Sequence, residues 1–274
     1  MKLLAWGLTH PGKKREHNED AFLINKELGL FAVADGMGGH MAGDRASRMA
    51  VELLEHEIEL SDLEEPTAAM GPKGGNPGES AMGRTLREAA RRTSRAIYDM
   101  GRNDPALYGM GTTLTALLFR EGHVHVAHVG DSRCYLFRDN EVRRLTEDHS
   151  WTEEQVRAGV MTPAEANNSS LKHVITRSVG FESDVDVDVQ SIQATGGDCF
   201  LVCSDGLYNY VDGEQLKGYL VDGNYAEAPR RLIDTANDCG GEDNITVLIV
   251  QLVELDAQQQ PDESNGSPPA GDAG

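Results

Sequence analysis

Four short runs typical of strands follow one another closely in the middle of the chain. They cover residues 112–119, 124–129, 134–137 and 142–145, and Gly, Asp and Asn residues stand between them. A crossover between parallel strands needs about a dozen residues or more, and these gaps are far too short for one. The sequence therefore predicts an antiparallel meander over this stretch.

Helical periodicity predicts three helices around such strands. The first, over residues 46–58, has an acidic polar face, whereas the second, over residues 86–100, is rich in arginine. Their opposite charges would let the polar flanks pair if the helices pack antiparallel. The third extends from about Pro229 to Cys239 and stops at two glycines. Further strands are expected at 30–34, 199–203 and 245–253, so the fold class is α+β.

The length of 274 residues allows one large domain or two small ones. The segment 256–274 is acidic, contains several prolines and has too few apolar residues to offset the entropy of ordering, so we predict a disordered acidic tail. Residues 61–80 are rich in Pro and Gly and separate the first two predicted helices. We therefore expect a flexible loop inside a single domain that covers residues 1–255.

The charge balance limits the partners of the chain. With 25 basic and 45 acidic residues, the formal net charge is −20, which repels nucleic acid and anionic membrane surfaces. No apolar stretch is long enough for a spanning helix, and Leu3–Trp6 is too short for the core of a signal peptide. We expect no nucleic-acid partner and no membrane attachment.

The cysteines indicate a cellular compartment. The four of them, Cys134, Cys199, Cys203 and Cys239, show no CxxC spacing and lie in apolar runs or at a helix end. This pattern favours buried free thiols over disulfides or zinc ligands, and free thiols are typical of a reducing environment. Because there is also no apolar stretch for a spanning helix or a signal-peptide core, we expect a cytoplasmic protein.

Acidic residues recur where the predicted strands begin or end, often beside glycine. They are Asp20, Asp35, Asp131, Asp205 and Asp243. A single aspartate at a strand end is usually a turn or cap residue, but five together form a stronger pattern. If the strands lie side by side, these carboxylates converge and repel one another unless a hard cation neutralises them. The set suits Mg²⁺ or Mn²⁺, and two ions about 3.5–4 Å apart would clamp an in-line displacement at phosphorus.

The five aspartates belong to a set of six short motifs. The motifs are Arg15-Glu16-His17-Asn18-Glu19-Asp20, Val33-Ala34-Asp35-Gly36-Met37-Gly38-Gly39-His40, Gly111-Thr112-Thr113, Val129-Gly130-Asp131-Ser132-Arg133, Cys203-Ser204-Asp205-Gly206-Leu207 and Glu242-Asp243-Asn244-Ile245-Thr246-Val247. In this order they resemble the motif set of the metal-dependent PPM (type 2C) protein serine/threonine phosphatases, in their compact bacterial form. The resemblance spans residues 3–253 and is specific because all six motifs are present in order.

The resemblance implies a fold. Members of this family have a central β-sandwich of two antiparallel sheets flanked by α-helices, in four αββα layers, with the metal site at one edge. Two possible capping boxes, Ser150–Glu153 and Thr162–Glu165, predict short helices in the stretch that corresponds to the family's flap. This small flap subdomain, at residues 149–176, is expected to contribute to the choice of substrate.

The resemblance also implies a dinuclear metal site. Asp35 would bridge both ions, and Gly36 would ligate one of them through its carbonyl oxygen. Asp205 and Asp243 would hold the other ion. The expected cofactor is therefore Mn²⁺ or Mg²⁺, with two ions per active site.

Other motif residues correspond to supporting roles in the family. Asp20, and with it Glu19, would act through metal-bound water. Asp131 matches the third-metal position of bacterial members. Arg15 stands where the family's phosphate-gripping arginine stands, and a guanidinium fork fits the geometry of phosphate.

Two positions depart from the family pattern. Many relatives have a histidine directly after the Asp-Gly pair, a candidate general acid, where this chain has Met37. His40 is near enough in sequence to be considered for that role. Relatives often carry an aspartate where Asn209 stands, and an amide binds a hard cation more weakly than a carboxylate does, so we expect a weaker third metal.

The resemblance implies hydrolysis of phosphoserine and phosphothreonine by direct attack of a metal-bridging hydroxide, without a phosphoenzyme. The expected partners are phosphorylated proteins and a bacterial serine/threonine kinase that the enzyme would oppose, and we expect a monomer. The sequence has no Cys in a CxxxxxR arrangement, which speaks against a cysteine-dependent tyrosine phosphatase. Two alternatives stay open: a non-catalytic phosphoprotein-binding module with the same fold, and a phosphatase of small metabolites.

Overall fold

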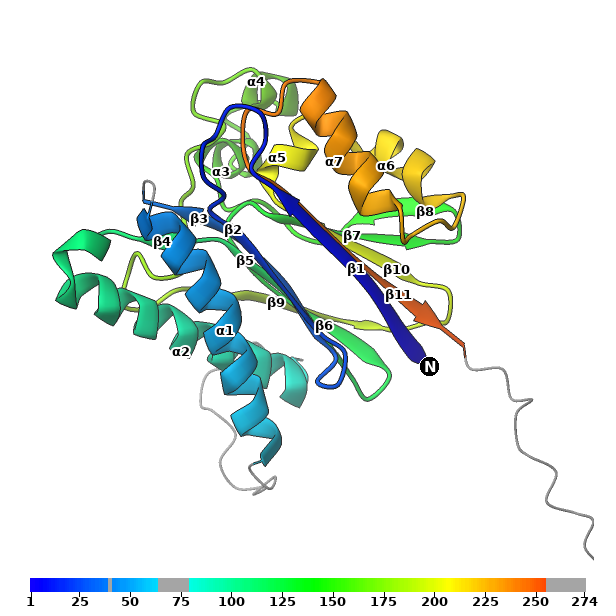
Figure 1. Cartoon of the computed structure of the whole chain (residues 1–274), viewed down its shortest axis with the longest axis horizontal. Coiled ribbons are helices and arrows are strands. Elements are labelled where there is room, and N and C mark those ends of the chain that lie inside the picture. Colours follow the sequence, from blue (N-terminus) through cyan, green and yellow to red (C-terminus); the bar gives the residue numbers. More distant parts are fainter. Residues whose placement is uncertain (39–40, 64–78, 255–274) are drawn as a thin grey trace, which may run out of the picture.

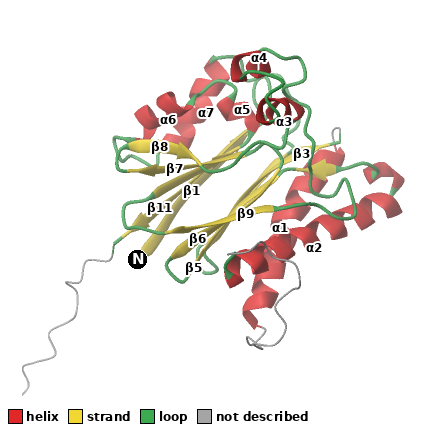
Figure 2. Cartoon of the chain, turned by 180° about the vertical axis from the view of Figure 1, so that it is seen from behind, coloured by secondary structure: helices red, strands yellow, loops and turns green. Residues whose placement is uncertain are grey.

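The computed structural model describes residues 1–38, 41–63 and 79–254. Two antiparallel sheets pack face to face, and helices cover the outer face of each sheet (Figure 1). The same layers are seen from behind in Figure 2. The expected αββα sandwich is thus confirmed. Most of the loop predicted at 61–80, and the tail predicted at 256–274, lie outside the described residues.

Each sheet is built from antiparallel neighbours. The first sheet has the order β1 (Lys2–His10), β11 (Ile245–Val253), β10 (Cys199–Cys203), β7 (Arg133–Arg138) and β8 (Glu141–Arg144). The second sheet has the order β2 (Asp20–Asn25), β3 (Leu30–Met37), β5 (Leu114–Arg120), β6 (His123–Val129) and β9 (Asp188–Gln193), and the short β4 (Gly111–Thr112) pairs with β3.

Two long helices, α1 (Met41–Leu63) and α2 (Ala81–Asn103), cover the second sheet. The apolar faces predicted from periodicity are largely the faces that they bury. Ser80 caps α2 by accepting a hydrogen bond from the backbone N–H of Gly83. Arg92 Nη1 lies 3.1 Å from Glu57 Oε2, so the oppositely charged flanks of the two helices do pair.

Three shorter helices, α5 (Asp205–Tyr208), α6 (Gly213–Leu220) and α7 (Ala228–Asp238), cover the first sheet. The bounds of α7 agree with the prediction to within one residue at each end. Apolar periodicity does not reveal α5 and α6 because they are so short, although Asp212 and Gln215 form a capping box at the start of α6. No helix in the described ranges is long and apolar enough to cross a membrane.

Side-chain alternation along the strands divides the interior into three apolar layers. Along β3, Phe31 and Val33 face the other sheet, whereas Leu30, Ala32 and Ala34 face α1 and α2. The outer face of the first sheet packs against α6 and α7 in the same way. Strands that are buried on both faces require continuous apolar runs, which explains why the central strands are evident in the sequence.

The strands between residues 112 and 145 form hairpins in two different sheets. β5 pairs with β6 in the second sheet, and β7 pairs with β8 in the first. The prediction of one meander is therefore wrong, because the chain changes sheet between β6 and β7. Short gaps favour antiparallel neighbours, but they do not show whether consecutive strands stay in one sheet. Asp131 lies on the link where the chain changes sheet.

The segment 149–176, called the flap segment from here on, leaves the first sheet after β8 and carries α3 (Trp151–Arg157) and α4 (Pro163–Asn167). Both helices begin at the predicted cap residues. The two ends of the flap segment meet, because the N–H of Thr176 donates to the carbonyl of His149 at 2.8 Å. The N–H of His149 in turn donates to the carbonyl of Gly130 at 2.7 Å, which attaches the flap segment beside the link between the sheets.

Candidate active site

Strand pairing and the link between the sheets bring the five aspartates together. Asp20 and Asp35 are partners across β2 and β3. Asp131 follows β6, Asp205 begins α5 with a single residue between it and the end of β10, and Asp243 precedes β11. The carboxylate of Asp35 is repelled electrostatically by the other four, so these groups share one end of the sandwich.

A cavity of about 740 Å³ lies at this end. The predicted site residues that line it are Arg15, Glu19, Asp35, Gly36, Asp131, Asp205 and Asp243. Asp20 is buried beside Asp35 and does not line the cavity. His40 lies outside the described residues, so the structure does not place it.

Burial and mutual repulsion raise the pKa values of the clustered carboxyl groups. Burial raises the pKa of Asp20 to about 7, and repulsion from Asp205 and Asp243 adds to the effect. Burial also raises the pKa of Asp131 to about 7, with repulsion from Asp205 next in importance. For Asp35, burial and then repulsion from Asp20 raise the pKa well above its ordinary value. A divalent cation among these groups would reverse the shifts by stabilising the charged forms.

The oxygen donors fit a hard divalent cation. Oδ1 of Asp20 and Oδ1 of Asp205 are buried and have no hydrogen-bond partner among the described residues. A buried carboxylate oxygen without a partner is costly unless water or a cation satisfies it. In the described part of the chain, no group of three or more Asp, Glu, His or Cys side chains is placed so that it could hold a metal ion as a cage. An ion such as Mg²⁺ keeps several waters and takes one or two carboxylates, so it does not need such a cage.

Gly36 and Asp35 are held by close backbone contacts. The N–H of Gly36 donates to the carbonyl of Glu19 at 3.1 Å. A Cβ atom at position 36 would lie 2.1 Å from the carbonyl oxygen of Gly43 and 2.6 Å from that of Glu19, so only glycine fits. The N–H of Asp35 donates to Thr113 Oγ1 at 2.9 Å, and the N–H of Thr113 donates to the carbonyl of Asp35 at 2.8 Å. These contacts fix the backbone that carries the Asp-Gly pair.

Arg15 reaches the cavity from the loop between β1 and β2. Its Nη2 atom lies 2.8 Å from Asp243 Oδ2, and this hydrogen bond raises the pKa of Arg15. The loop is tied down by Asn244, whose Nδ2 donates to the carbonyls of Pro11 and His17 at 3.0 and 2.9 Å. Asn244 is thus a supporting residue, and its place directly after Asp243 in the sixth motif is the sequence signal for it.

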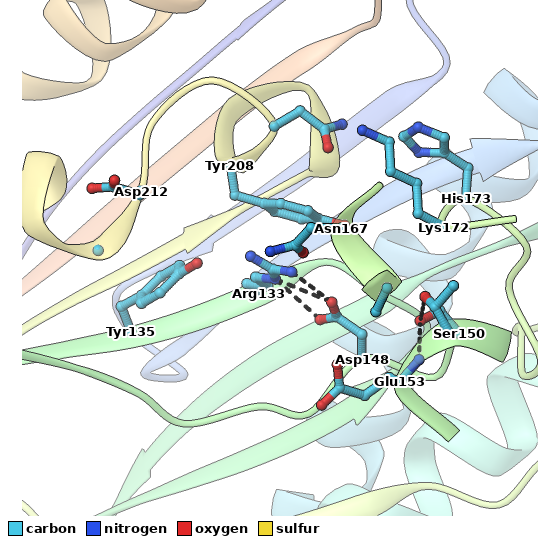
Figure 3. Close-up of a pocket in the computed structure, with 14 residues that line it drawn as sticks. Arg133, Tyr135, Asp148, Ser150, Glu153, Asn167, Lys172, His173, Tyr208 and Asp212 are labelled. Carbon is cyan, nitrogen blue, oxygen red and sulfur yellow. Dashed lines mark hydrogen bonds and ion pairs between the residues drawn. The ribbon is translucent and has the colours of Figure 1, made fainter. Parts of the chain in front are cut away.

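The flap segment contributes three residues that the sequence does not single out, Lys172, His173 and Ile175. Lys172 and His173 line the cavity, and His173 Nδ1 lies 3.6 Å from Asp205 Oδ2. The interaction with Asp205 raises the pKa of His173. Both side chains also line a neighbouring pocket of about 380 Å³, which Figure 3 shows. The flap segment is therefore in contact with the carboxylate cluster.

Tyr208 connects this neighbouring pocket to Asp131. The guanidinium of Arg133 lies over the Tyr208 ring, 3.6 Å from its centroid, and Asp148 holds Arg133 through bonds of 3.1 and 2.7 Å (Figure 3). A hydrogen bond from Tyr208 lowers the pKa of Asp131, against the larger effect of burial. Asn209 lines both cavities, and its Nδ2 lies 3.4 Å from an oxygen of Asp205.

Comparisons with known proteins bear on what this site does. The family described as protein phosphatase 2C matches residues 9–246 of the chain. The serine/threonine phosphatase stp of Listeria welshimeri is 38% identical over 247 residues, which are 89% of this chain and 93% of that protein. The serine/threonine protein phosphatase PstP of Mycobacterium tuberculosis is 37% identical over 252 residues, which are 91% of this chain and 45% of PstP.

Solved structures agree with these relationships. The M. tuberculosis phosphatase PstP/Ppp has a TM-score of 0.80 at 34% identity, covering 93% of this chain and 100% of that one. The Staphylococcus aureus phosphatase Stp1 has a TM-score of 0.81 at 30% identity, covering 93% and 96%. The catalytic domain of PstP, solved with two manganese ions, has a TM-score of 0.76 at 34% identity, covering 92% and 99%. The chain therefore belongs to the protein phosphatase 2C family, the metal-dependent PPM protein serine/threonine phosphatases.

Proposed function

We propose that this phosphatase hydrolyses phosphoserine and phosphothreonine in proteins by direct attack of water on phosphorus, without a phosphoenzyme. The observation that carries the proposal is the convergence of Asp35, Asp205 and Asp243 on one cavity with Arg15 at its wall. Carboxylates that hold cations, beside an arginine that binds phosphate, suit a reaction whose catalysis is positioning and charge stabilisation. The relatives named as serine/threonine phosphatases support this substrate class.

Arg15 acts directly on the phosphoryl group, whereas Asp20 and Glu19 act through water. Arg15 binds the phosphoryl oxygens through its guanidinium fork, and its contact with Asp243 keeps it beside the cavity beforehand. Asp20 is buried behind the cavity, and together with Glu19 it would act through water held at the carboxylate cluster; its Oδ1 has no hydrogen-bond partner among the described residues. The bond between phosphorus and the serine or threonine oxygen breaks as water adds, the leaving oxygen takes up a proton, and inorganic phosphate is released.

The carboxylate cluster would hold two Mn²⁺ or Mg²⁺ ions, with Asp35 bridging them, Gly36 contributing its carbonyl, and Asp205 and Asp243 on the second ion. When bound, the ions lower the pKa of the attacking water and neutralise charge on the phosphoryl oxygens. The relative solved with two manganese ions supports this number. Asp131, together with Asp205, would hold a third ion more weakly.

We also infer a cytoplasmic enzyme that opposes a serine/threonine kinase. The cysteines support the compartment: all four are free, and Cys134, Cys199 and Cys203 are buried. Cys239 is exposed, so the expectation that it is buried is wrong. It ends α7, where one side of the helix faces solvent.

The test measures phosphate release from a phosphothreonine peptide and from a sugar phosphate, with Mn²⁺ and with EDTA. We expect Mn²⁺-dependent release from the peptide and much slower release from the sugar phosphate. Asp139→Asn, in the exposed turn between β7 and β8, is a matched control that should behave as wild type. Preference for the sugar phosphate would assign a metabolite phosphatase. Binding of the phosphopeptide without release would assign a binding module.

A further inference from the structure

Asp20 is held by hydroxyl groups on one of its two oxygens only. The residue is 6% exposed and lies opposite Asp35 across β2 and β3. Its Oδ2 accepts hydrogen bonds from Ser204 Oγ at 2.8 Å and from Thr246 Oγ1 at 2.6 Å. Its Oδ1 is buried and has no hydrogen-bond partner in the described part of the chain. The two oxygens of one carboxylate are therefore in unequal surroundings.

The direction of the hydroxyl bonds follows from the chemistry of the groups at each end. A carboxylate can only accept, so the single proton of Thr246 goes to Asp20. Thr9 must then donate to Thr246 across their contact of 2.7 Å, and the side-chain amide of Asn18 donates to Thr9 at 2.8 Å. Three residues, Asn18, Thr9 and Thr246, thus form a chain of donors that ends on Oδ2 of Asp20.

Ser204 is oriented toward the same oxygen by the backbone. Its Oγ accepts a hydrogen bond from the N–H of Thr246 at 2.9 Å, which leaves the hydroxyl proton free to point at Asp20. Ser204 directly follows β10 and Thr246 lies in β11, which are neighbouring interior strands of the first sheet, whereas Asp20 begins a strand of the second. The hydroxyl pair therefore fixes this carboxylate across the gap between the two sheets.

We propose that Thr246 and Ser204 are positioning residues, which hold Asp20 in the rotamer that leaves Oδ1 available to the metal cluster. The inference rests on the proposed function, because it assigns a purpose to Oδ1 of Asp20, the oxygen that has no partner among the described residues. Groups that orient a metal-site carboxylate through its second oxygen contribute about 10- to 100-fold to metal affinity. Neither hydroxyl touches the substrate or the reacting atoms in this scheme.

The test is the affinity of the full-length protein for Mn²⁺, measured by calorimetry on Thr246→Val, Thr246→Ser and Ser204→Ala. Valine keeps the shape of threonine and removes the hydroxyl, so we expect binding about 10- to 100-fold weaker than in wild type. Serine keeps the hydroxyl and should restore most of the affinity. Ser204→Ala should weaken binding as well, which provides a second variant if Thr246→Val does not fold.

Thr93→Val is the matched control. Thr93 is 1% exposed and its hydroxyl has no partner among the described residues, so this variant removes a buried hydroxyl without breaking a hydrogen bond. It should bind Mn²⁺ like wild type. Unchanged affinity in folded Thr246→Val and Ser204→Ala would overturn the positioning role and leave the proposed function intact. Failure of wild type itself to bind Mn²⁺ would overturn both.

Discussion

Arg15 Nη2 and Asp243 Oδ2 lie 2.8 Å apart, so the residue expected to grip phosphate is paired with a residue expected to bind metal. The side chains are 55% and 37% exposed, and an ion pair so open to solvent is weak. A cation beside Asp243 and a phosphate beside Arg15 would each compete for one partner of the pair. The pair thus keeps Arg15 at the cavity while leaving it free to move onto substrate.

Arg15→Ala should lower kcat/KM for a phosphothreonine peptide by about 100-fold, because a charge-assisted contact to the transferring phosphoryl group is lost. The kcat/KM of Arg15→Lys should lie between those of Arg15→Ala and wild type, because an ammonium group keeps the positive charge but lacks the two parallel N–H donors of a guanidinium. Steady-state kinetics at saturating Mn²⁺ measure both effects. Lys14→Ala changes the exposed neighbouring cation, and an equal loss in that variant would contradict a specific role for Arg15.

His128 should make the protein less stable in acid. It is 2% exposed, its Nε2 donates to the carbonyl of Glu147 at 2.9 Å, and burial lowers its pKa to about 3. Between about pH 6.5 and 3 the unfolded chain binds a proton that the folded protein does not, so stability falls as the pH drops, by at most about 1.4 kcal/mol per pH unit.

The measurement is urea denaturation of wild type and His128→Gln under identical metal conditions. Because the carboxylate cluster titrates in the same range in both proteins, the difference between them isolates His128. From pH 7 to pH 5, the free energy of unfolding of wild type should fall by about 2 kcal/mol more than that of the variant. His123→Gln, at an exposed histidine of the same strand, should show no such shift. A difference that does not change with pH would refute the assignment.

Asn209→Asp should increase the affinity of the protein for the third metal ion. Asn209 is exposed at the end of α5, with its amide 3.4 Å from an oxygen of Asp205, so a carboxylate there would join Asp205 and Asp131. We expect at least about 10-fold stronger binding in the weakest Mn²⁺ step seen by calorimetry, because a charged oxygen replaces a neutral one. Asn168→Asp, in the flap segment, is the control for added charge. Three equally tight sites in wild type would contradict the expected weakness.

Arg138→Ala should destabilise the fold without touching the active site. Arg138 binds both oxygens of Asp198 at 2.7 Å, and Asp198 is 1% exposed. The variant leaves a buried carboxylate without its cation, which is costly. Because Arg138 is a third exposed, solvent screens part of the interaction, so we expect a loss of about 2 kcal/mol in the free energy of unfolding. Arg143→Ala, at an exposed arginine nearby, should change stability by less than about 0.5 kcal/mol. Equal losses in the two variants would contradict this account.

The parts of the fold that the sequence predicts are those with a strong local pattern. The faces of α1 and α2 follow from helical periodicity, and β3, β10 and β11 follow from continuous apolar runs. β9 is an edge strand without a buried residue, and its sequence carries no such run. β1 contains the apolar run Leu3–Trp6 but is also an edge strand without a buried residue, so a run of this length does not by itself mark an interior strand. The change of sheet at Asp131 depends on packing between distant segments, which gap lengths do not reveal.

The residues of the candidate site also fall into two groups, those that stand in a local sequence motif and those that only the packing of the fold brings to the site. The carboxylates that converge, from Asp20 to Asp243, stand in short motifs at strand ends, where sequence and position coincide. Lys172 and His173 come to the cavity through the flap segment, and Tyr208 reaches Asp131 from α5. Nothing in their local sequence marks these three residues. The hydroxyl pair at Asp20 is visible only when the two sheets are packed together.

The most direct test of the central claim is phosphate release by Asp35→Asn at saturating Mn²⁺, beside wild type and Asp139→Asn. Asparagine keeps the shape of the residue that the account places between the two ions, but it removes the charge. We predict a folded protein by circular dichroism with kcat at least about 1,000-fold below wild type. Turnover by Asp35→Asn close to that of wild type would contradict the account.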